Sequence, residues 1–482
     1  MKKEKTITTN FALNFIRTIL TLVFPVITFS YASRVLGKEG IGKVNFATSV
    51  VSYYTMIASL GIANYGIREG ARIRDQKEKF SKLVQELFVI NLIMTSFSYV
   101  VFFIMICFVP QMQNYKSVLL IYGLSIGLAA LGLEWVYSAQ EDYYYITIRQ
   151  IVIQGISIVL LLVLVRDTTD YLYYALILVV SSVGANVFNF AYSRKYVDWK
   201  YQGHYDLKRH LKPVLILFSY TVSVNLYNNL DSTMLGLQIG DTEVGIYSAA
   251  VKMNRMVISL LASLGVVLIP RISYYLEKRE QKKFEVLVKK SMQFNLMFSI
   301  PAAVGMFVLG EEIITLFSGS GFSEATTTLR ILTLIIMIIP ITTLVNSQIL
   351  IPSKKETYVA LTTLVGLIVN FCLNYIFIPI YGANGAAAAS VLAEFSVMCV
   401  ALVFVRKVLD IRQAFKGAWQ YIVASLPIFF VSGLVHYFVS NIFLIIILCV
   451  GLSCGVYIIM LLILKNDFVK EIIQKGKKIL HR

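Results

Sequence analysis

Long apolar segments recur along the chain from near its N-terminus almost to its C-terminus. Most hold about 20 predominantly apolar residues, the length at which an α-helix crosses the hydrocarbon core of a membrane. Only short polar stretches separate them. The pattern predicts an all-α polytopic membrane protein with about fourteen transmembrane helices. These cover residues 11–35, 44–66, 83–108, 117–139, 147–166, 172–193, 214–238, 246–270, 291–309, 329–351, 357–380, 385–405, 418–438 and 441–464.

The seventh and eighth predicted helices form a hairpin around the turn 239–245. Polar side chains recur on both helices at steps of three and four residues, which places them along one face. The line includes Asn225 and Asn228 on the seventh helix, and Lys252 and Arg255 on the eighth. Because polar faces are expensive against lipid, we expect both lines to border a central water-filled cleft.

Lys252 and Arg255 lie at a membrane depth similar to that of Asp231, at a rise of ~1.5 Å per residue from the turn between them. One interpretation is a binding site for an anionic substrate such as phosphate. Arginine binds phosphate oxygens through two parallel hydrogen bonds, and lysine binds them with a compact charge on a flexible side chain. The other is a structural ion pair between Asp231 and one of the cations. The first is favoured because one carboxylate neutralises only one of two cations.

An internal repeat organises the predicted helices. The turn 37–42 resembles the turn 240–245, and each follows the first helix of a six-helix unit. Because each unit has an even number of helices, the two lobes share their orientation and are related by an axis along the membrane normal. The predicted domains are an N-terminal lobe 11–195, a C-terminal lobe 212–406, an additional hairpin 418–464 and a cytoplasmic amphipathic tail 465–482.

The first predicted helix carries further candidates for the cleft. Asn14 and Arg17 lie on its polar face near the cytoplasmic end, where Arg17 either lines the cleft or extends its charge to the membrane surface. Pro25 is expected to kink this helix at mid-membrane and to act as a hinge. Arg34 lies near the external end, as a phosphate-neutralising group or as an ordinary rim residue.

Glu134 closes the fourth predicted helix at a depth similar to that of Arg17. We expect the two side chains to interact in one conformation and to form part of an inner gate. Trp135 and Tyr137, beside Glu134, fit the aromatic belt that marks a membrane interface. The sequence alone leaves a gating role and an interfacial role open for this segment.

Composition and charge limit the class of protein. Apolar residues make up 57% of the 482 residues and charged residues only 15%, which excludes a soluble protein of this length. The net charge of +17 comes from lysines and arginines in the short stretches between apolar segments. Their distribution places both termini in the cytoplasm and forms no groove for nucleic acid. The five cysteines show neither a metal-ligand spacing nor a disulfide pattern.

Catalytic signatures are missing from the sequence. It contains no phosphate-binding loop for ATP, no zinc-protease motif and no paired-carboxylate motif. A membrane-bound polymerase or ligase would need a large external loop with catalytic side chains, whereas the longest predicted external loop, 310–328, is short and acidic. We therefore predict a transporter and not an enzyme, without a cofactor or a bound metal. A lipid scaffold without transport is disfavoured by the charges within the membrane.

Four motifs are spread over much of the chain. They are Ser33-Arg-Val-Leu-Gly-Lys-Glu-Gly-Ile-Gly42 after Pro25, Glu134-Trp-Val-Tyr-Ser-Ala-Gln-Glu141, Asn229-Leu-Asp-Ser-Thr-Met-Leu-Gly236 and Val244-Gly-Ile-Tyr-Ser-Ala-Ala250. Their order and spacing resemble the oligosaccharide-lipid flippases of the Wzx type. This family shares a superfamily with multidrug-and-toxin extruders and lipid II flippases. Fourteen helices favour a polysaccharide or lipid II flippase over the extruders, which usually have twelve, and the first helix lacks the denser charge cluster of lipid II flippases.

The resemblance implies translocation of a polyprenyl-pyrophosphate-linked oligosaccharide repeat unit from the inner to the outer leaflet, by alternating access, for capsule or O-antigen assembly. The expected location is a bacterial cytoplasmic membrane. The expected partners are this substrate, anionic lipids, and polysaccharide polymerase and chain-length machinery. A lipid II flippase and a cation-coupled multidrug exporter are the alternatives. The coupling ion, H⁺ or Na⁺, stays open.

Overall fold

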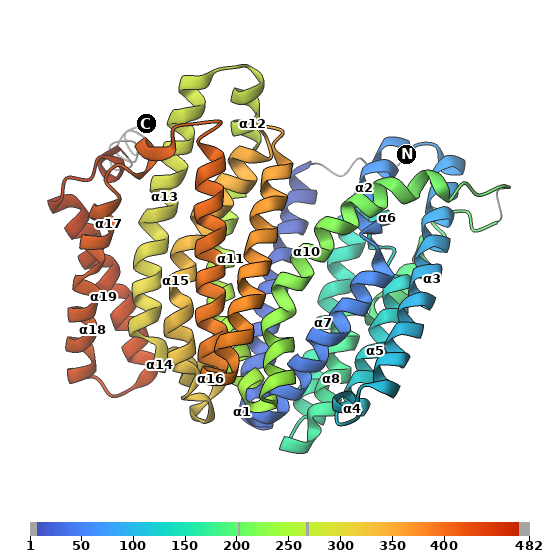
Figure 1. The fold of residues 1–482 in the computed structure, drawn as a ribbon, viewed down its shortest axis with the longest axis horizontal. Helices are drawn as coiled ribbons and strands as arrows, with labels where there is room; N and C mark the ends of the chain where they lie inside the picture. Colours follow the sequence, from blue (N-terminus) through green and yellow to red (C-terminus); the bar gives the residue numbers. More distant parts are fainter. Residues whose placement is uncertain (1–6, 201–202, 267–268, 472–482) are drawn as a thin grey trace. The chain divides into compact units, whose positions relative to one another are not determined.

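The computed structural model describes residues 7–200, 203–266 and 269–471 (Figure 1). For residues 7–20, 22, 220, 263–266 and 269, only the backbone is described. Throughout these ranges every regular element is a helix and none is a strand, which confirms the predicted all-α class. Residues 472–482, most of the predicted amphipathic tail, lie outside the described residues.

Contacts between residues divide the chain into two compact units, Met1–Gly245 and Ile246–Arg482. In the first unit, α1 packs against α3, α5, α7 and α10. Its helices are α1 (Ile7–Ser59), α2 (Ile62–Ile73), α3 (Lys77–Phe108), α4 (Pro110–Gln113), α5 (Lys116–Ala130), α6 (Glu134–Ala139), α7 (Tyr143–Leu164), α8 (Tyr171–Val179), a π-helical segment (Val180–Gly184), α9 (Asn186–Ser193) and α10 (Lys208–Gln238).

Helix α11 (Asp241–Val266) begins in the first unit and continues into the second. In the second unit, α13 packs against α15 and α17, and α15 packs against α16. The remaining helices are α12 (Ile269–Glu277), α13 (Gln281–Val308), α14 (Gly310–Ser318), α15 (Ala325–Thr343), a π-helical segment (Leu344–Leu350), α16 (Glu356–Val405), α17 (Ala418–Ser425), α18 (Pro427–Phe438) and α19 (Ile442–Ile463).

Two helices each contain two predicted membrane segments. Helix α1 bends at Gly37 and α16 bends at Gly382, where the backbone has φ of 66° and 55°. Glycine adopts such angles without steric cost, so the chain reverses there without a longer loop. Ten helices in the described ranges are long and apolar enough to cross a membrane. Helices α10 and α11, which hold the polar lines, are not among them, and the count of fourteen spans stays a prediction.

Two predicted boundaries are wrong. The second predicted helix, 44–66, ends at Ser59, because Leu60 and Gly61 both have positive φ, and α2 begins at Ile62. The fourth, 117–139, breaks between α5 and α6. Both interruptions occur within continuous apolar sequence, where hydropathy carries no signal for the end of a helix.

The boundary between the compact units differs from the predicted boundary between the lobes. The lobes were placed on either side of the basic linker 194–212, whereas the contacts divide the chain after Gly245. The difference arises because α10, the first helix of the predicted second lobe, packs along α1. The two six-helix lobes around a central cleft therefore stay a prediction.

Helices α17, α18 and α19 form the segment predicted as an additional hairpin. Tyr421 and Tyr457 are buried where α17 and α19 meet α13. The Tyr457 hydroxyl donates a hydrogen bond to the Met297 carbonyl at 2.8 Å. At the other end of the hairpin, His436 Nε2 lies 2.6 Å from Glu312 Oε1 of α14. These contacts attach the hairpin to the rest of the second unit at both ends.

Candidate functional site

The two repeated turns lie against each other within the first unit. Gly42 is packed on the Asp241 backbone, and Gly245 is packed on the Lys38 backbone. A Cβ atom on either glycine would overlap a carbonyl oxygen of the opposite turn. Gly42 and Gly245 are equivalent in the repeat, and so are Lys38 and Asp241, so the contact is reciprocal. We call this contact the glycine clasp.

Aromatic and polar contacts support the glycine clasp. The Phe46 ring packs on Gly236 and lies 4.6 Å from the Tyr115 ring between centroids. The Tyr115 hydroxyl donates a hydrogen bond to Asp241 Oδ1 at 2.7 Å. These contacts join α1, α5, α10 and α11 around the two turns, which the sequence analysis predicted to be external.

Polar side chains also join α10 to the second half of α1. The Ser52 hydroxyl donates to Asn225 Oδ1 at 3.2 Å. Thr233 lies 3.1 Å from the Ser49 hydroxyl and 3.0 Å from the Tyr53 hydroxyl. Asn225 was predicted to border a cleft, but the structure places it against α1. Polar groups in an apolar surrounding are stabilised by pairing with each other, so part of the predicted line serves helix packing.

The other candidates on α10 and α11 lie in two different units. On α10, Asp231 is only 8% exposed and Asn228 is exposed. On α11, Lys252 is half-buried and Arg255 is exposed. Lys252 and Arg255 are three residues apart and share a helix face. The substrate-binding interpretation and the ion-pair interpretation both stay predictions.

The candidates on α1 are described only in part. The side chains of Asn14 and Arg17 lie outside the described residues. Helix α1 continues through Pro25, and among its described residues the non-helical backbone is at Gly37. Gly37 lies in the turn between the first and second predicted helices, so both the mid-membrane kink at Pro25 and its hinge role stay predictions. Arg34 is exposed near that turn, as a rim residue is expected to be.

Glu134 pairs with an arginine that the sequence analysis did not select. Arg149 of α7 donates to Glu134 Oε2 at 2.7 Å and also to Asn189 Oδ1. The Arg149 side chain is only 10% exposed, and its Nε has no hydrogen-bond partner among the described residues. The signal was present, because Arg149 lies within the predicted span 147–166, where a cation is expensive.

The segment around Glu134 is a packed junction and not an aromatic belt. Trp135 and Tyr137 are 5% and 0% exposed, so the predicted interfacial position is wrong for both. The Trp135 ring fills the space above Gly66, and the Tyr137 hydroxyl donates to the Asn189 carbonyl. Aromatic rings of this size can be accommodated here because α2, α6 and α9 meet around them.

Asp142 anchors the tyrosines that follow this junction on the predicted cytoplasmic side. Its Oδ2 accepts hydrogen bonds from the Tyr196 hydroxyl at 2.8 Å and the Tyr192 hydroxyl at 3.1 Å. Burial, together with the nearby Asp142 carboxylate, raises the pKa of Tyr196 to about 12. Tyr196 therefore stays protonated and acts as a donor across the neutral pH range.

An apolar cavity of about 410 Å³ lies in the second unit between α13, α14 and the helices α18 and α19. Met297, Pro301, Ile446, Val450 and Ile458 are among its lining residues. The sequence does not reveal this cavity, because apolar residues that line a cavity form the same pattern as apolar residues that face lipid. Its size and lining suit a hydrocarbon chain.

Models of two protein families match parts of the chain. The model of the polysaccharide biosynthesis protein family matches residues 7–276, which is more than half of the chain. The chain belongs to this family. A second model, MatE, matches residues 217–376.

Proteins with similar sequences or similar folds match most of the chain. The putative O-antigen transporter of Escherichia coli (strain K12) is 23% identical over 392 residues, which are 80% of this chain and 93% of that protein. The lipid II flippase MurJ has a similar fold, with a TM-score of 0.76 and 17% identity over 95% of this chain and all of that one. A multidrug resistance MATE family transporter follows, with a TM-score of 0.65 and 14% identity over 80% of this chain and 94% of that one.

Proposed function

We propose that this member of the polysaccharide biosynthesis protein family is a flippase. It moves a polyprenyl-pyrophosphate-linked oligosaccharide repeat unit from the inner to the outer leaflet of a bacterial cytoplasmic membrane. The observation that carries the proposal is the similarity to a putative O-antigen transporter along nearly its whole length. The fold, shared with a lipid II flippase, supports the same class of substrate.

The charged headgroup is the part of such a substrate that hydrocarbon excludes. Moving an unpaired pyrophosphate through the membrane core would cost far more than ordinary binding energy supplies. Lys252 and Arg255 on α11 offer cations in the predicted outer half, and Arg17 offers one in the predicted inner half. Phosphate partners at two depths would lower the barrier for the headgroup throughout its passage.

The polyprenyl chain needs a different surface. The apolar cavity beside α18 and α19 has walls without a charged side chain. Exposed residues on the outer faces of these helices, such as Phe430 and Ile459, are apolar and suit direct contact with lipid. A prenyl chain can therefore occupy the cavity while its headgroup is carried elsewhere in the protein.

Alternating access requires that the external side open and close. The glycine clasp supplies a close contact between the backbones of the two turns, at Gly42 and Gly245. We assign the closing of the external side to this clasp.

A multidrug exporter is the second candidate, because the MatE model matches residues 217–376. A cation-transporting cleft should be acidic. The charged residues predicted for this cleft include Arg17, Lys252 and Arg255 against the carboxylate of Asp231, which favours an anionic substrate.

Both termini are assigned to the cytoplasm from the distribution of lysines and arginines. Polymerase and chain-length proteins are the expected partners on the external side, and the chain acts as a transporter without catalysis of its own. Either H⁺ or Na⁺ would serve as the coupling ion.

Transport of the substrate tests the function directly. Purified protein is reconstituted in vesicles with a fluorescent polyprenyl-pyrophosphate sugar, and the fraction of substrate accessible to an external quencher is followed over time. We expect this fraction to change faster with the protein than in protein-free vesicles. A cationic drug that crosses instead, with no movement of the lipid-linked sugar, would establish the exporter.

A further inference from the structure

The first turns of α10 have one face that is fixed to the rest of the first unit. His210 is 2% exposed, and its Nε2 lies 2.9 Å from Glu86 Oε2 of α3. The Tyr65 hydroxyl of α2 lies 2.9 Å from His210 Nδ1. Glu86, which is fully buried, also accepts a hydrogen bond from the Arg209 guanidinium. These contacts determine the rotation of the helix about its axis.

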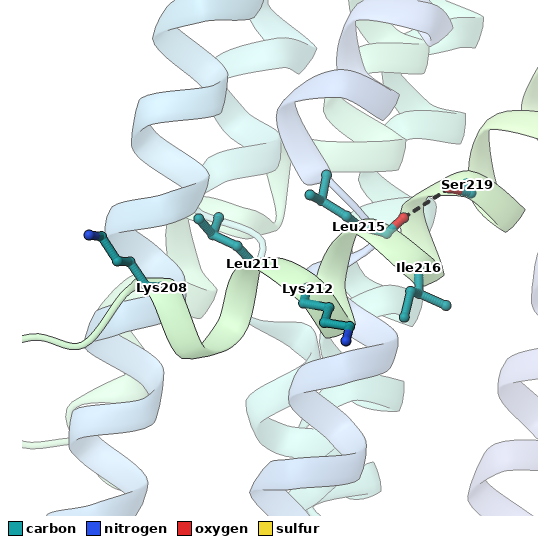
Figure 2. A pocket seen from close by; sticks show the side chains of 6 residues that line it. All are labelled: Lys208, Leu211, Lys212, Leu215, Ile216 and Ser219. Atoms are coloured by element: carbon teal, nitrogen blue, oxygen red, sulfur yellow. Dashed lines mark hydrogen bonds between the residues drawn. The ribbon is translucent and has the colours of Figure 1, made fainter.

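The opposite face of α10 is exposed and forms a shallow hollow of about 500 Å³ (Figure 2). Its residues follow helical spacing along a single face. Figure 2 shows the Ser219 hydroxyl bonded within the helix, to the Leu215 carbonyl at 3.0 Å. The hollow is lined by Lys208, Leu211, Lys212, Leu215, Ile216 and Ser219.

The two lysines of this face differ from their neighbour Arg209 in their contacts. Within the ranges that the structure describes, neither Lys208 nor Lys212 lies within ion-pair distance of a carboxylate, whereas the neighbouring Arg209 is paired with Glu86. Leu211, Leu215 and Ile216 are 42%, 51% and 63% exposed. Two cations at the start of the helix and apolar side chains further along it complement a lipid with an anionic head.

We propose that this face, the α10 entry face, binds the diphosphate group of the polyprenyl carrier at the inner leaflet before translocation. Lys208 and Lys212 meet the phosphates, and Leu211, Leu215 and Ile216 meet the first isoprene units. The proposal rests on the proposed function, because it takes the flippase substrate as its ligand. The predicted topology places the start of α10 near the cytoplasmic membrane surface. There the lysines would lie at the level of the lipid phosphates, and the apolar side chains would lie deeper, at the level of the hydrocarbon chains.

The test uses a photoreactive farnesyl diphosphate and the full-length protein in phosphatidylcholine nanodiscs. Labelled peptides are identified for the wild type, for Lys208→Gln with Lys212→Gln, and for the control Lys278→Gln with Lys282→Gln. The control removes two exposed lysines, also four residues apart, from another predicted cytoplasmic stretch. Each lysine near a membrane phosphate contributes about 1 kcal/mol, so we expect labelling of α10 to fall at least tenfold in the first double variant.

Several results would overturn the proposal. The first two are labelling of α10 that is unchanged in the Lys208→Gln, Lys212→Gln variant, and a loss of labelling that is as large in the control variant. The third is equal labelling of the wild type by photoreactive farnesol, which lacks the diphosphate. The fourth is full competition by phosphatidylglycerol, which would make the face a general anchor for anionic lipids. Thermal stability of the α10 variant near that of the wild type excludes misfolding as the cause of a loss. If the wild type transports the lipid-linked sugar but α10 is not labelled, the proposed entry face is refuted and the flippase function is not. If α10 is labelled but the lipid-linked sugar is not transported, the flippase function is refuted and binding at the entry face is not.

Discussion

Two pairs of charged side chains within the predicted membrane segments have different assigned roles. Arg149 and Glu134 pair with each other within one unit, and their role is visible as a contact. Lys252 and Arg255 share one face of α11, three residues apart, and their proposed role is to bind phosphate. The two pairs should respond differently to substitution.

The double variant Lys252→Ala, Arg255→Ala tests the phosphate role. We expect export of surface polysaccharide per unit of membrane-inserted protein to fall by at least tenfold, with normal abundance, because each lost charge-assisted contact is worth about 1.5–3 kcal/mol. Arg255→Lys should retain partial export, since lysine keeps the positive charge but cannot form the two parallel hydrogen bonds of a guanidinium group. If Asp231→Asn depletes the protein as strongly as Arg255→Ala does, the cations are structural.

Glu134→Gln tests the buried pair. The substitution leaves Arg149 charged in a site where it is only 10% exposed, so we expect a loss of about 2 kcal/mol or more in stability. The measurement is thermal unfolding of the purified protein. The control is Glu141→Gln, which breaks an exposed pair with Arg74 and should cost less than about 1 kcal/mol. Equal losses in the two variants would contradict a structural role for the Glu134–Arg149 pair.

At this scale, the sequence predicted which positions are unusual but not what they contact. Asn225 was recognised as a polar residue within an apolar segment, yet its partner Ser52 lies far away in the chain. For Trp135 an interfacial role was one of two interpretations, because amphipathic rings favour the membrane interface, whereas its packing on Gly66 buries it. Periodicity identifies a face of a helix, and only the fold determines which helix meets that face.

At the scale of elements, the repeated turns are the clearest case of a prediction that the structure extends. Their similarity could be seen in the sequence, and it implied equivalent positions in two lobes. That the turns contact each other through Gly42 and Gly245 could not be predicted, because a glycine in a turn is equally explained by backbone geometry alone. Helix breaks such as that at Leu60 were also hidden by continuous hydropathy.

Gly42→Ala and Gly245→Ala test the glycine clasp. Each added methyl group would overlap backbone atoms that cannot move aside as a side chain can, at a cost of about 1–3 kcal/mol. We expect the population of the closed state, relative to the open state, to fall at least fivefold. The measurement is the rate at which a membrane-impermeant thiol reagent labels a cysteine introduced at Asn45, in an otherwise cysteine-free protein. It should rise in both variants.

Gly451→Ala is the matched control for the clasp, because a Cβ atom there meets nothing within 4 Å. It should leave the labelling rate of the cysteine at position 45 unchanged. If the clasp variants behave like this control, then the turns do not close the external side.

At the scale of the whole molecule, hydropathy was sufficient to predict the helical class, and the topology inferred from the charges stays a prediction. The division into compact units was not predictable, since it depends on the packing of α10 along α1. The apolar cavity was equally hidden, because its lining residues have the same composition as a lipid-facing surface.

The predicted topology is tested with single cysteines at Gly203 and Ser320, in the linker before α10 and the loop after α14. In intact cells we expect an impermeant reagent to label position 320 and to label position 203 only after the membrane is permeabilised. Labelling of both from outside would contradict fourteen spans with cytoplasmic termini.

The central claim is that the chain carries a polyprenyl-pyrophosphate-linked oligosaccharide between leaflets. The most direct measurement is the leaflet distribution of a fluorescent polyprenyl-pyrophosphate sugar in vesicles that contain the wild type or the Lys252→Ala, Arg255→Ala variant. Rapid redistribution with the wild type, and a rate at least tenfold lower with the variant, is the predicted result. A wild-type rate equal to that of protein-free vesicles, under both a proton and a sodium gradient, would contradict the account.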